Sequence, residues 1–116
     1  MQLPLQVSFH NMPHSDAIED LIGERAELLD EFAQDIMSCR VVVDIPHKHH
    51  EHGAAYQVRV DVKLPGKEIA STHEPGEKGV YDDIHIAVRD AFDSVVRQIE
   101  DYVRRRRGDV KSHRAP

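Results

Sequence analysis

Four short segments of the chain have the apolar pattern of β-strands. Apolar and polar residues alternate along residues 3–9, and residues 39–45 are rich in β-branched side chains. The alternation is most regular along residues 56–64, which predicts a strand with one buried and one wet face. The turn-forming pair Pro65–Gly66 separates this segment from residues 67–72, so the last two strands are predicted to form a hairpin.

Two longer segments place apolar residues three or four positions apart, as in a helix with one buried face. The first begins at Ser15 or Asp16, which can cap a helix, and its outer face is mostly acidic. The second extends from about Tyr81 to Arg107, and Gly108 is placed to end it. The two apolar stripes comprise Ile18, Leu21, Ile22, Leu29, Phe32 and Ile36 in the first helix, and Ile84, Val88, Ala91, Phe92, Val95, Ile99 and Tyr102 in the second.

The predicted order of elements is therefore β-α-β-β-β-α, an α+β fold. We expect a four-stranded mixed sheet with both helices packed on one face and with the other face open to solvent. The domain is expected to cover residues 1–108, and residues 109–116 are expected to form a flexible basic tail. No internal repeat or second domain is evident.

Composition indicates one soluble domain. A chain of 116 residues can build one modest core, and 40% apolar and 31% charged residues are typical of a globular protein. Cys39 is the single cysteine, which excludes an internal disulfide and suits a reducing compartment. No apolar run approaches the roughly 20 residues that span a bilayer, and residues 1–6 lack the pattern of a secretory signal. We therefore expect a cytoplasmic protein with no membrane partner.

Charge is distributed unevenly along the chain, whose formal net charge is -6. Residues 104–116 contain six basic residues and one acidic residue, whereas the rest contains nine basic and twenty acidic residues. A basic segment on an acidic body is typical of an interaction tail. An acidic body repels a polyanion, but a short arginine run can still neutralise several phosphates. This distribution favours RNA as the partner.

Nine basic residues are candidates for contact with RNA. Those in the run from Arg104 to Arg107 carry most weight, because four consecutive arginines exceed what is needed to stabilise a helix end. Two others lie on the wet face of the third strand, where they either contact RNA or only keep the protein soluble. The candidates are Arg59, Lys63, Arg89, Arg97, Arg104, Arg105, Arg106, Arg107 and Lys111.

Arg89 and Arg97 lie close to one face of the second helix. Contact with RNA is one interpretation of this pair. Ion pairs with Asp93 and Asp101, each four residues further on, explain the same residues equally well.

A cluster of histidines lies between the second and third strands. Imidazoles at this spacing can chelate zinc, nickel or copper, and they gain charge near neutral pH. No cysteine lies nearby, however, and a loop does not hold a tetrahedral geometry. We expect no metal and no other cofactor, and we keep a metal-responsive domain as an alternative function. Its candidate ligands are His47, His49, His50 and His52.

The sequence contains no arrangement typical of an enzyme. Cys39 lies in a predicted strand without a neighbouring base, so a buried structural thiol is expected. Nothing in their spacing makes Asp82 and Asp83 an acid–base pair with a histidine. Gly76 and Gly79 lack the flanking residues of a phosphate-binding loop. We expect a binding protein without catalytic activity.

The ordered set of segments resembles the ribosome hibernation promoting factor and ribosome-associated inhibitor family, once called sigma-54 modulation proteins. The resemblance covers roughly residues 3–112 and is strongest in the second helix. The segments that carry it are Asp83–Asp93, Arg97–Tyr102, the opening strand, Cys39–Val43, and Tyr56–Val62 with Pro65–Gly66.

The resemblance implies the same β-α-β-β-β-α fold, which is similar to double-stranded RNA-binding domains. It also implies a function: occupying the small-subunit decoding region where tRNA and messenger RNA bind, and so idling ribosomes under stress. The expected partners are the small ribosomal subunit and its rRNA, with no DNA. The expected mechanism is steric and electrostatic.

The chain departs from the family pattern at several positions. Members of the family often carry lysines along both helices, and a tyrosine near the start of the second. These departures shift the expected RNA contact toward the arginine run. The positions that differ are Leu28, Glu31, Ser94 and Asp101 for the lysines, and His85 for the tyrosine.

A third function remains open beside RNA binding and a metal-responsive domain, namely a protein-interaction module whose acidic first helix binds a basic partner. An exposed sheet edge permits self-association, but nothing in the sequence requires it. The sequence leaves the oligomeric state open and favours a monomer.

Overall fold

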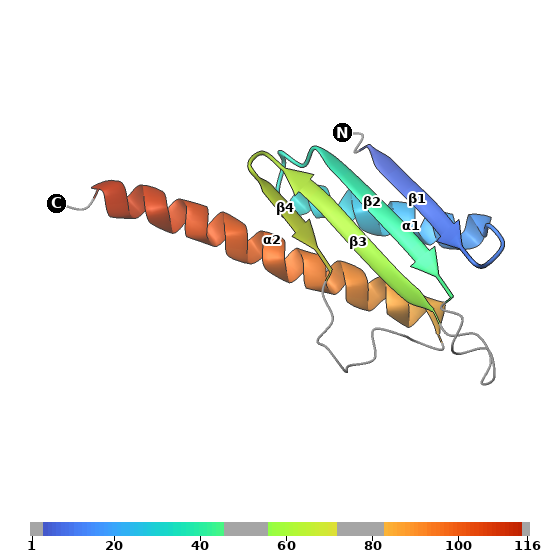
Figure 1. Cartoon of the computed structure of the whole chain (residues 1–116). Coiled ribbons are helices and arrows are strands. Elements are labelled where there is room, and N and C mark those ends of the chain that lie inside the picture. The colour runs from blue at the N-terminus through green and yellow to red at the C-terminus, as the bar shows by residue number, and fades with distance from the viewer. Residues whose placement is uncertain (1–3, 46–55, 72–82, 115–116) are drawn as a thin grey trace.

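The computed structural model of the chain describes residues 4–45, 56–71 and 83–114, with side chains described as far as Arg107 (Figure 1). It contains one four-stranded sheet with the strand order β1-β2-β3-β4. Strands β1 and β2 are parallel, and the other neighbours are antiparallel. The predicted mixed sheet is therefore confirmed. The strands are β1 (Leu5–His10), β2 (Ser38–Asp44), β3 (Gln57–Leu64) and β4 (Lys67–Ala70).

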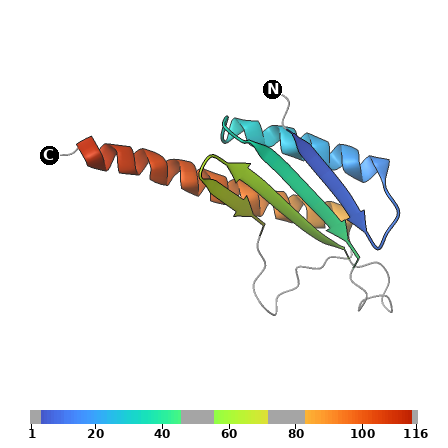
Figure 2. The ribbon, with the colours of Figure 1, turned by 45° about the horizontal axis from the view of Figure 1, so that its top comes forward.

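Two helices cover one face of this sheet, as predicted (Figures 1 and 2). Helix α1 (Asp16–Leu28) connects the parallel strands β1 and β2, which need such a crossover. The Ser15 hydroxyl begins the helix by accepting a hydrogen bond from the Ile18 N–H at 3.3 Å. Helix α2 (Ile84–Arg114) follows β4 and contacts β3, β4 and α1.

The first helix is shorter than its apolar spacing predicts. It ends at Leu28, and one 3-10 turn, η1 (Leu29–Glu31), follows it. The expected continuation to Ile36 was wrong, although Ala33 and Ile36 are buried. These two residues reach the core from a non-helical connection, because burial requires only that a side chain points inward.

The second helix is longer than predicted. It begins at Ile84 and continues through Gly108 to Arg114, so the expected end at Gly108 was wrong. A glycine in a helix costs about 1 kcal/mol relative to alanine, which does not by itself end a helix. The division into a domain of residues 1–108 and a basic tail of residues 109–116 stays a prediction.

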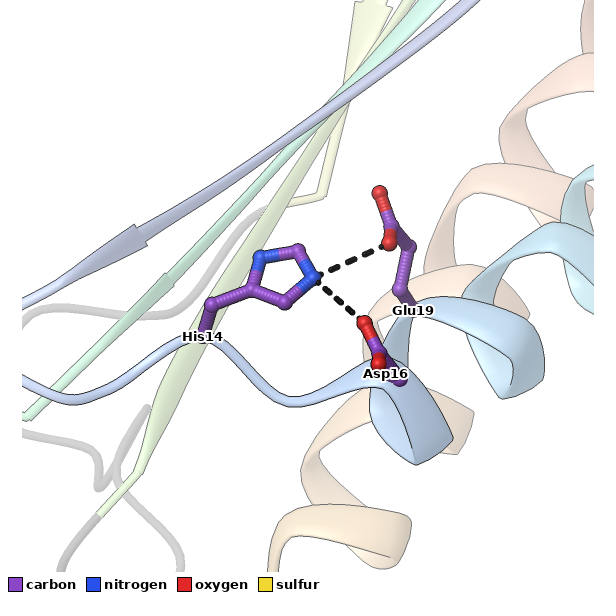
Figure 3. A group of neighbouring side chains, drawn as sticks. All are labelled: His14, Asp16 and Glu19. Carbon is purple, nitrogen blue, oxygen red and sulfur yellow. Dashed lines mark hydrogen bonds and ion pairs between the residues drawn. The ribbon is translucent and has the colours of Figure 1, made fainter.

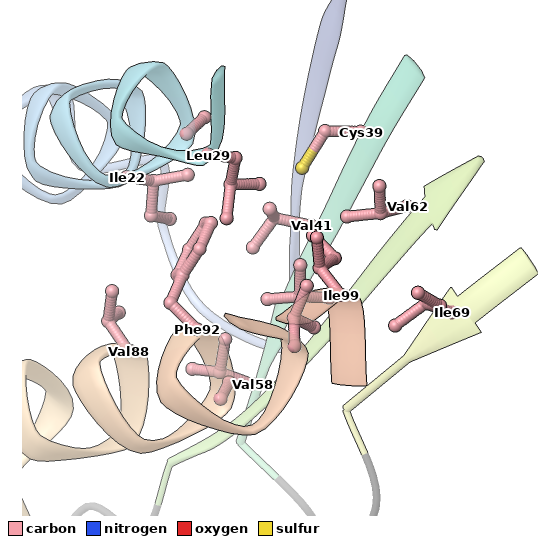
Figure 4. Close-up of a cluster of buried hydrophobic side chains, with 14 of the residues drawn as sticks. Ile22, Leu29, Cys39, Val41, Val58, Val62, Ile69, Val88, Phe92 and Ile99 are labelled. Carbon is pink, nitrogen blue, oxygen red and sulfur yellow. The ribbon is translucent and has the colours of Figure 1, made fainter. Parts of the chain in front are cut away.

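The core lies between the sheet and the two helices (Figure 4). Phe92 of α2 is 2% exposed and lies beside Ile22 and Leu29 in the close-up. The predicted apolar stripes supply most of the helical part, while Leu21, Phe32, Ile84 and Tyr102 are only partly buried at its rim. The strands contribute alternate residues: Cys39, Val41 and Val43 from β2, and Val58, Val60, Val62 and Leu64 from β3.

The tight turn between β3 and β4 confirms the predicted hairpin. Its second residue, Gly66, has φ +75°, a left-handed conformation that glycine adopts without strain. Among the described helices, none is both long and apolar enough to pass through a membrane.

Candidate nucleic-acid interface

The arginine run lies where α2 leaves the body of the protein. Among the helix side chains that the structure describes, as far as Arg107, the last fully buried one is Ile99. Tyr102 and Val103 pack only against the edge of the core. The C-terminal end of α2 extends beyond the sheet, as Figure 1 shows. All four arginines of the run are exposed. A helix rises 1.5 Å per residue, so the segment from Arg104 to Arg114 is about 15 Å long.

Arg97 and Arg104 lie seven residues apart on one side of α2 and line the same shallow groove. Ser94, Gln98 and the two acids Glu100 and Asp101 also line this groove. The Gln98 amide donates hydrogen bonds to the Ala70 carbonyl at 2.7 Å and to the Ser94 hydroxyl at 3.3 Å, which ties this stretch of the helix to β4. Within the described part of the chain, Arg97 forms no ion pair. Its guanidinium is therefore available to a phosphate.

Three arginines of the run have acidic neighbours. Asp101 pairs with Arg104 at 3.8 Å and with Arg105 at 3.1 Å. Arg106 pairs with Asp35 at 3.3 Å, and its guanidinium lies 5.0 Å from the centre of the Tyr102 ring. The hydrogen bond that the Arg106 guanidinium donates to the Asp35 carboxylate is the main cause that raises the pKa of Arg106 above its ordinary value. The run is thus held in place by weak, exposed pairs that a polyanion can replace.

The ion pairs that were the alternative interpretation of Arg89 and Arg97 do not form. Arg89 pairs with the adjacent Asp90 at 3.1 Å rather than with Asp93. Asp101 pairs with residues that follow it and not with Arg97. In a helix, an acid that precedes its basic partner by four residues is better oriented than the reverse, which favours Asp101–Arg105.

A second group of basic residues lies on the open face of the sheet. Arg59 and Lys63 point away from the helices, as predicted, and Arg59 pairs with Asp61 at 3.1 Å. Arg40 of β2 points to the same side, because its neighbours Cys39 and Val41 are buried. Sequence reasoning missed Arg40, although the buried residues on both sides of it are the signal that could have identified it. Together these residues line a shallow polar groove.

The remaining sequence candidates lie outside the described residues. These are Lys111, whose side chain is not described, and the possible metal ligands His47, His49, His50 and His52.

The structure does bring one histidine and two acids together, at the start of α1 (Figure 3). The Nε2 atom of His14 lies 3.0 Å from an Asp16 carboxylate oxygen and 3.1 Å from one of Glu19. The imidazole also packs edge-on against Phe9. The positive end of the helix dipole stabilises acids in the first turn. The same positive end disfavours an added cation there. The cluster therefore stabilises the N-terminal end of α1. The spacing of these residues in the sequence did not identify it.

Two of the groups considered for catalysis, Cys39 and Asp83, have structural roles. Cys39 is 1% exposed, and burial, followed by the charge of Asp61, raises the pKa of its thiol to about 12. Such a thiol is a poor nucleophile. The Asp83 carboxylate accepts a hydrogen bond from the His85 N–H at 2.9 Å at the start of α2. Asp82 lies outside the described residues.

Comparison with known proteins agrees with this architecture. Residues 5–107 match the family described as sigma 54 modulation protein / S30EA ribosomal protein. No match is found among curated protein sequences.

Two solved structures share the fold at low sequence identity. A ribosomal subunit interface protein from Coxiella burnetii superposes with a TM-score of 0.69 at 18% identity, covering 86% of this chain and 97% of that one. The N-terminal domain of Thermus thermophilus Protein Y gives 0.67 at 19% identity, covering 86% and 99%. Because the family match covers nearly all of the described fold, the chain belongs to the sigma 54 modulation protein / S30EA ribosomal protein family, a family of ribosome-associated proteins.

Proposed function

We propose that this protein binds the rRNA of the small ribosomal subunit in the decoding and tRNA region and thereby idles ribosomes under stress. The family supports the ribosome as partner, and the similar Coxiella protein is described as a subunit interface protein. The observation that carries the proposal is the exposed arginine run on the part of α2 that extends beyond the sheet.

This placement suits phosphate binding for a physical reason. The exposed acids of α1 would repel RNA from that helix, whereas the C-terminal end of α2 extends away from α1. Four consecutive arginines point to different sides of a helix, because successive residues are about 100° apart. They can therefore meet phosphates on more than one strand, as in a folded RNA.

A second part of the proposed contact runs back along α2. Arg97 and Arg104 border a groove that also holds the acids Glu100 and Asp101 and the Ser94 hydroxyl, which can hydrogen-bond to sugar or phosphate. The chain carries Ser94 and Asp101 where members of the family often have lysine, and Asp101 already pairs with two arginines. We therefore infer that affinity depends more on the projecting end than on the middle of the helix.

The proposed mechanism is occupation of a site and includes no chemical reaction. A rigid sheet with two helices fills the space that tRNA and messenger RNA need, and the arginines hold it there by phosphate contacts. The protein acts as a monomer in the cytoplasm, where its partner is found.

Co-sedimentation with purified small subunits tests this proposal. We expect the protein to pellet with subunits at low salt and to be released as salt rises. Replacing Arg104 and Arg107 by alanine should weaken pelleting without unfolding the domain, because both side chains are exposed. Arg25→Ala with Lys67→Ala is the matched control, since it also removes two positive charges, from the acidic helix α1 and from β4.

A competition measurement tests the location. Subunits loaded beforehand with messenger RNA and tRNA should bind less of the protein than empty subunits. Equal binding to loaded and empty subunits would show that the protein lies elsewhere on the ribosome. Absence of pelleting at every salt concentration would contradict the proposal as a whole.

A further inference from the structure

The outer side of α1 forms a second surface that the proposed RNA contact does not use. Four exposed acids follow one another at helical spacing: Asp20, Glu24, Glu27 and, in η1, Glu31. The buried residues Ile18, Ile22 and Ala26 lie on the opposite side of the helix. We call these four acids together with Leu28 the acidic ridge.

Within the described part of the chain, no acid of the ridge forms an ion pair. Like charges at i,i+3 and i,i+4 destabilise a helix, so the ridge weakens α1. The helix dipole does not account for it, because Glu24 and Glu27 lie in the second half of α1, toward the negative end. Among the residues that the structure describes, these acids therefore have no ion-pair partner that would explain them.

An exposed apolar residue lies within the same surface. Leu28 is 48% exposed, and it is four residues from Glu24 and three from Glu31. A leucine at this position contributes little to the core, whereas it can pack against an apolar side chain or the aliphatic stem of a lysine. Negative charge around an exposed leucine complements a cationic segment that also carries an apolar residue, and it repels nucleic acid.

We propose that the acidic ridge binds a lysine- and arginine-rich polypeptide segment that places an apolar side chain on Leu28. This second contact is independent of the RNA contact through α2. The two surfaces differ in the sign of charge they attract, so one molecule can hold RNA and a basic polypeptide at once. Nucleic acid is excluded from the ridge by charge.

The test uses the full-length protein and a fluorescent 12-residue peptide of lysines with two central leucines, followed by fluorescence anisotropy at low salt. Neutralising two acids of the ridge, as Glu24→Gln with Glu27→Gln, should weaken binding about 5-fold, because each exposed ion pair contributes little. Leu28→Ala should weaken it about 3-fold through lost apolar contact.

The matched control removes two charges from exposed acids of α2 instead, as Asp93→Asn with Glu100→Gln. This variant has the same net charge as the ridge variant, so it should change peptide affinity less than about 2-fold if the ridge is the site. Equal weakening by both variants would show unspecific attraction to an acidic protein and would overturn the proposal. Unchanged binding by Leu28→Ala would overturn it as well.

Two further outcomes separate this inference from RNA binding. Glu24→Gln with Glu27→Gln should leave pelleting with small subunits by the α2 contact in place, and substitution of the arginine run should leave peptide affinity unchanged or higher. Amide chemical shifts on peptide addition should change along residues 20–31. Changes confined to other residues, or binding of a 12-nucleotide RNA at the ridge, would contradict the proposal.

Discussion

Gly23 occupies the interior of α1 without an evident packing reason. A Cβ atom added there meets nothing within 4 Å. Glycine in a helix interior is less favourable than alanine because it loses more backbone entropy on folding. Gly23→Ala should therefore raise the free energy of unfolding by about 0.5–1 kcal/mol, measured by urea denaturation. The same substitution at Gly66, whose φ is +75°, should instead lower it.

The Cys39 thiol links stability to pH at the scale of one residue. Its folded-state pKa is raised from 9.0 to about 12, so the folded protein keeps the proton that the unfolded chain loses above pH 9. The stabilising contribution is complete below pH 9 and is lost as the pH rises toward 12. Between pH 9 and 12 we expect this thiol to lower the free energy of unfolding by about 1.4 kcal/mol per pH unit.

Cys39→Ala isolates this contribution. The variant should be less stable at neutral pH because it leaves a small cavity, but its unfolding free energy should fall less steeply above pH 9. Parallel pH profiles for the two proteins would show that the thiol is not the responsible group. Alkylation of Cys39 in the native protein should likewise be slow and should accelerate on unfolding.

At the scale of elements, Phe92 joins α2 to the rest of the core. It is 2% exposed and packs with residues from both helices and the sheet. Phe92→Ala should lower the free energy of unfolding by about 3–5 kcal/mol, a large part of the stability of a domain this size. Ile86 of the same helix is 37% exposed, so Ile86→Ala should cost less than about 1 kcal/mol. Thermal unfolding of both variants tests this difference.

The two arginines in the middle of α2 differ in their surroundings and should differ in effect. Arg97 borders the groove, whereas Arg89 is already paired with Asp90. Under the proposed function, Arg97→Ala should weaken small-subunit binding about 5-fold and flatten its salt dependence, and Arg89→Ala should change affinity less than about 2-fold. If Arg89→Ala weakened co-sedimentation more than Arg97→Ala, the RNA contact would lie nearer the start of α2 than proposed.

At the scale of the whole molecule, charge is segregated between an acidic body and the arginine end of α2. If that end is the main phosphate contact, log affinity plotted against log salt should be steep for the native protein. Replacing all four residues from Arg104 to Arg107 by alanine should reduce the slope by about 3, since each phosphate contact contributes slightly less than one released ion. An unchanged slope would place the contact on other basic residues.

Local pattern was sufficient to predict the order of elements, the strands and the buried stripes. Alternation along β3 and helical spacing in α2 indicate which side chains face a core. Each pattern can be recognised within a short segment of sequence. The predicted ends of the helices were wrong, because the position of a helix end depends on competing contacts. Ile36 is buried after the helix has ended, and α2 continues through Gly108.

The candidate interface was only partly predictable. Sequence alone identified the arginine run and its exposure at the end of a helix, because consecutive charged residues cannot all be buried. It did not identify the pairing of Asp35 with Arg106, which joins residues 71 positions apart. It also missed the placement of Arg40 beside Arg59 and Lys63 on one open face.

Sequence by itself therefore determined the elements, the apolar faces and the net sign of charge of each segment, since these follow from the period of the backbone. Tertiary structure decided which charges lie near one another. Distances between side chains from different elements depend on how the sheet and helices pack, and electrostatic interactions depend on those distances.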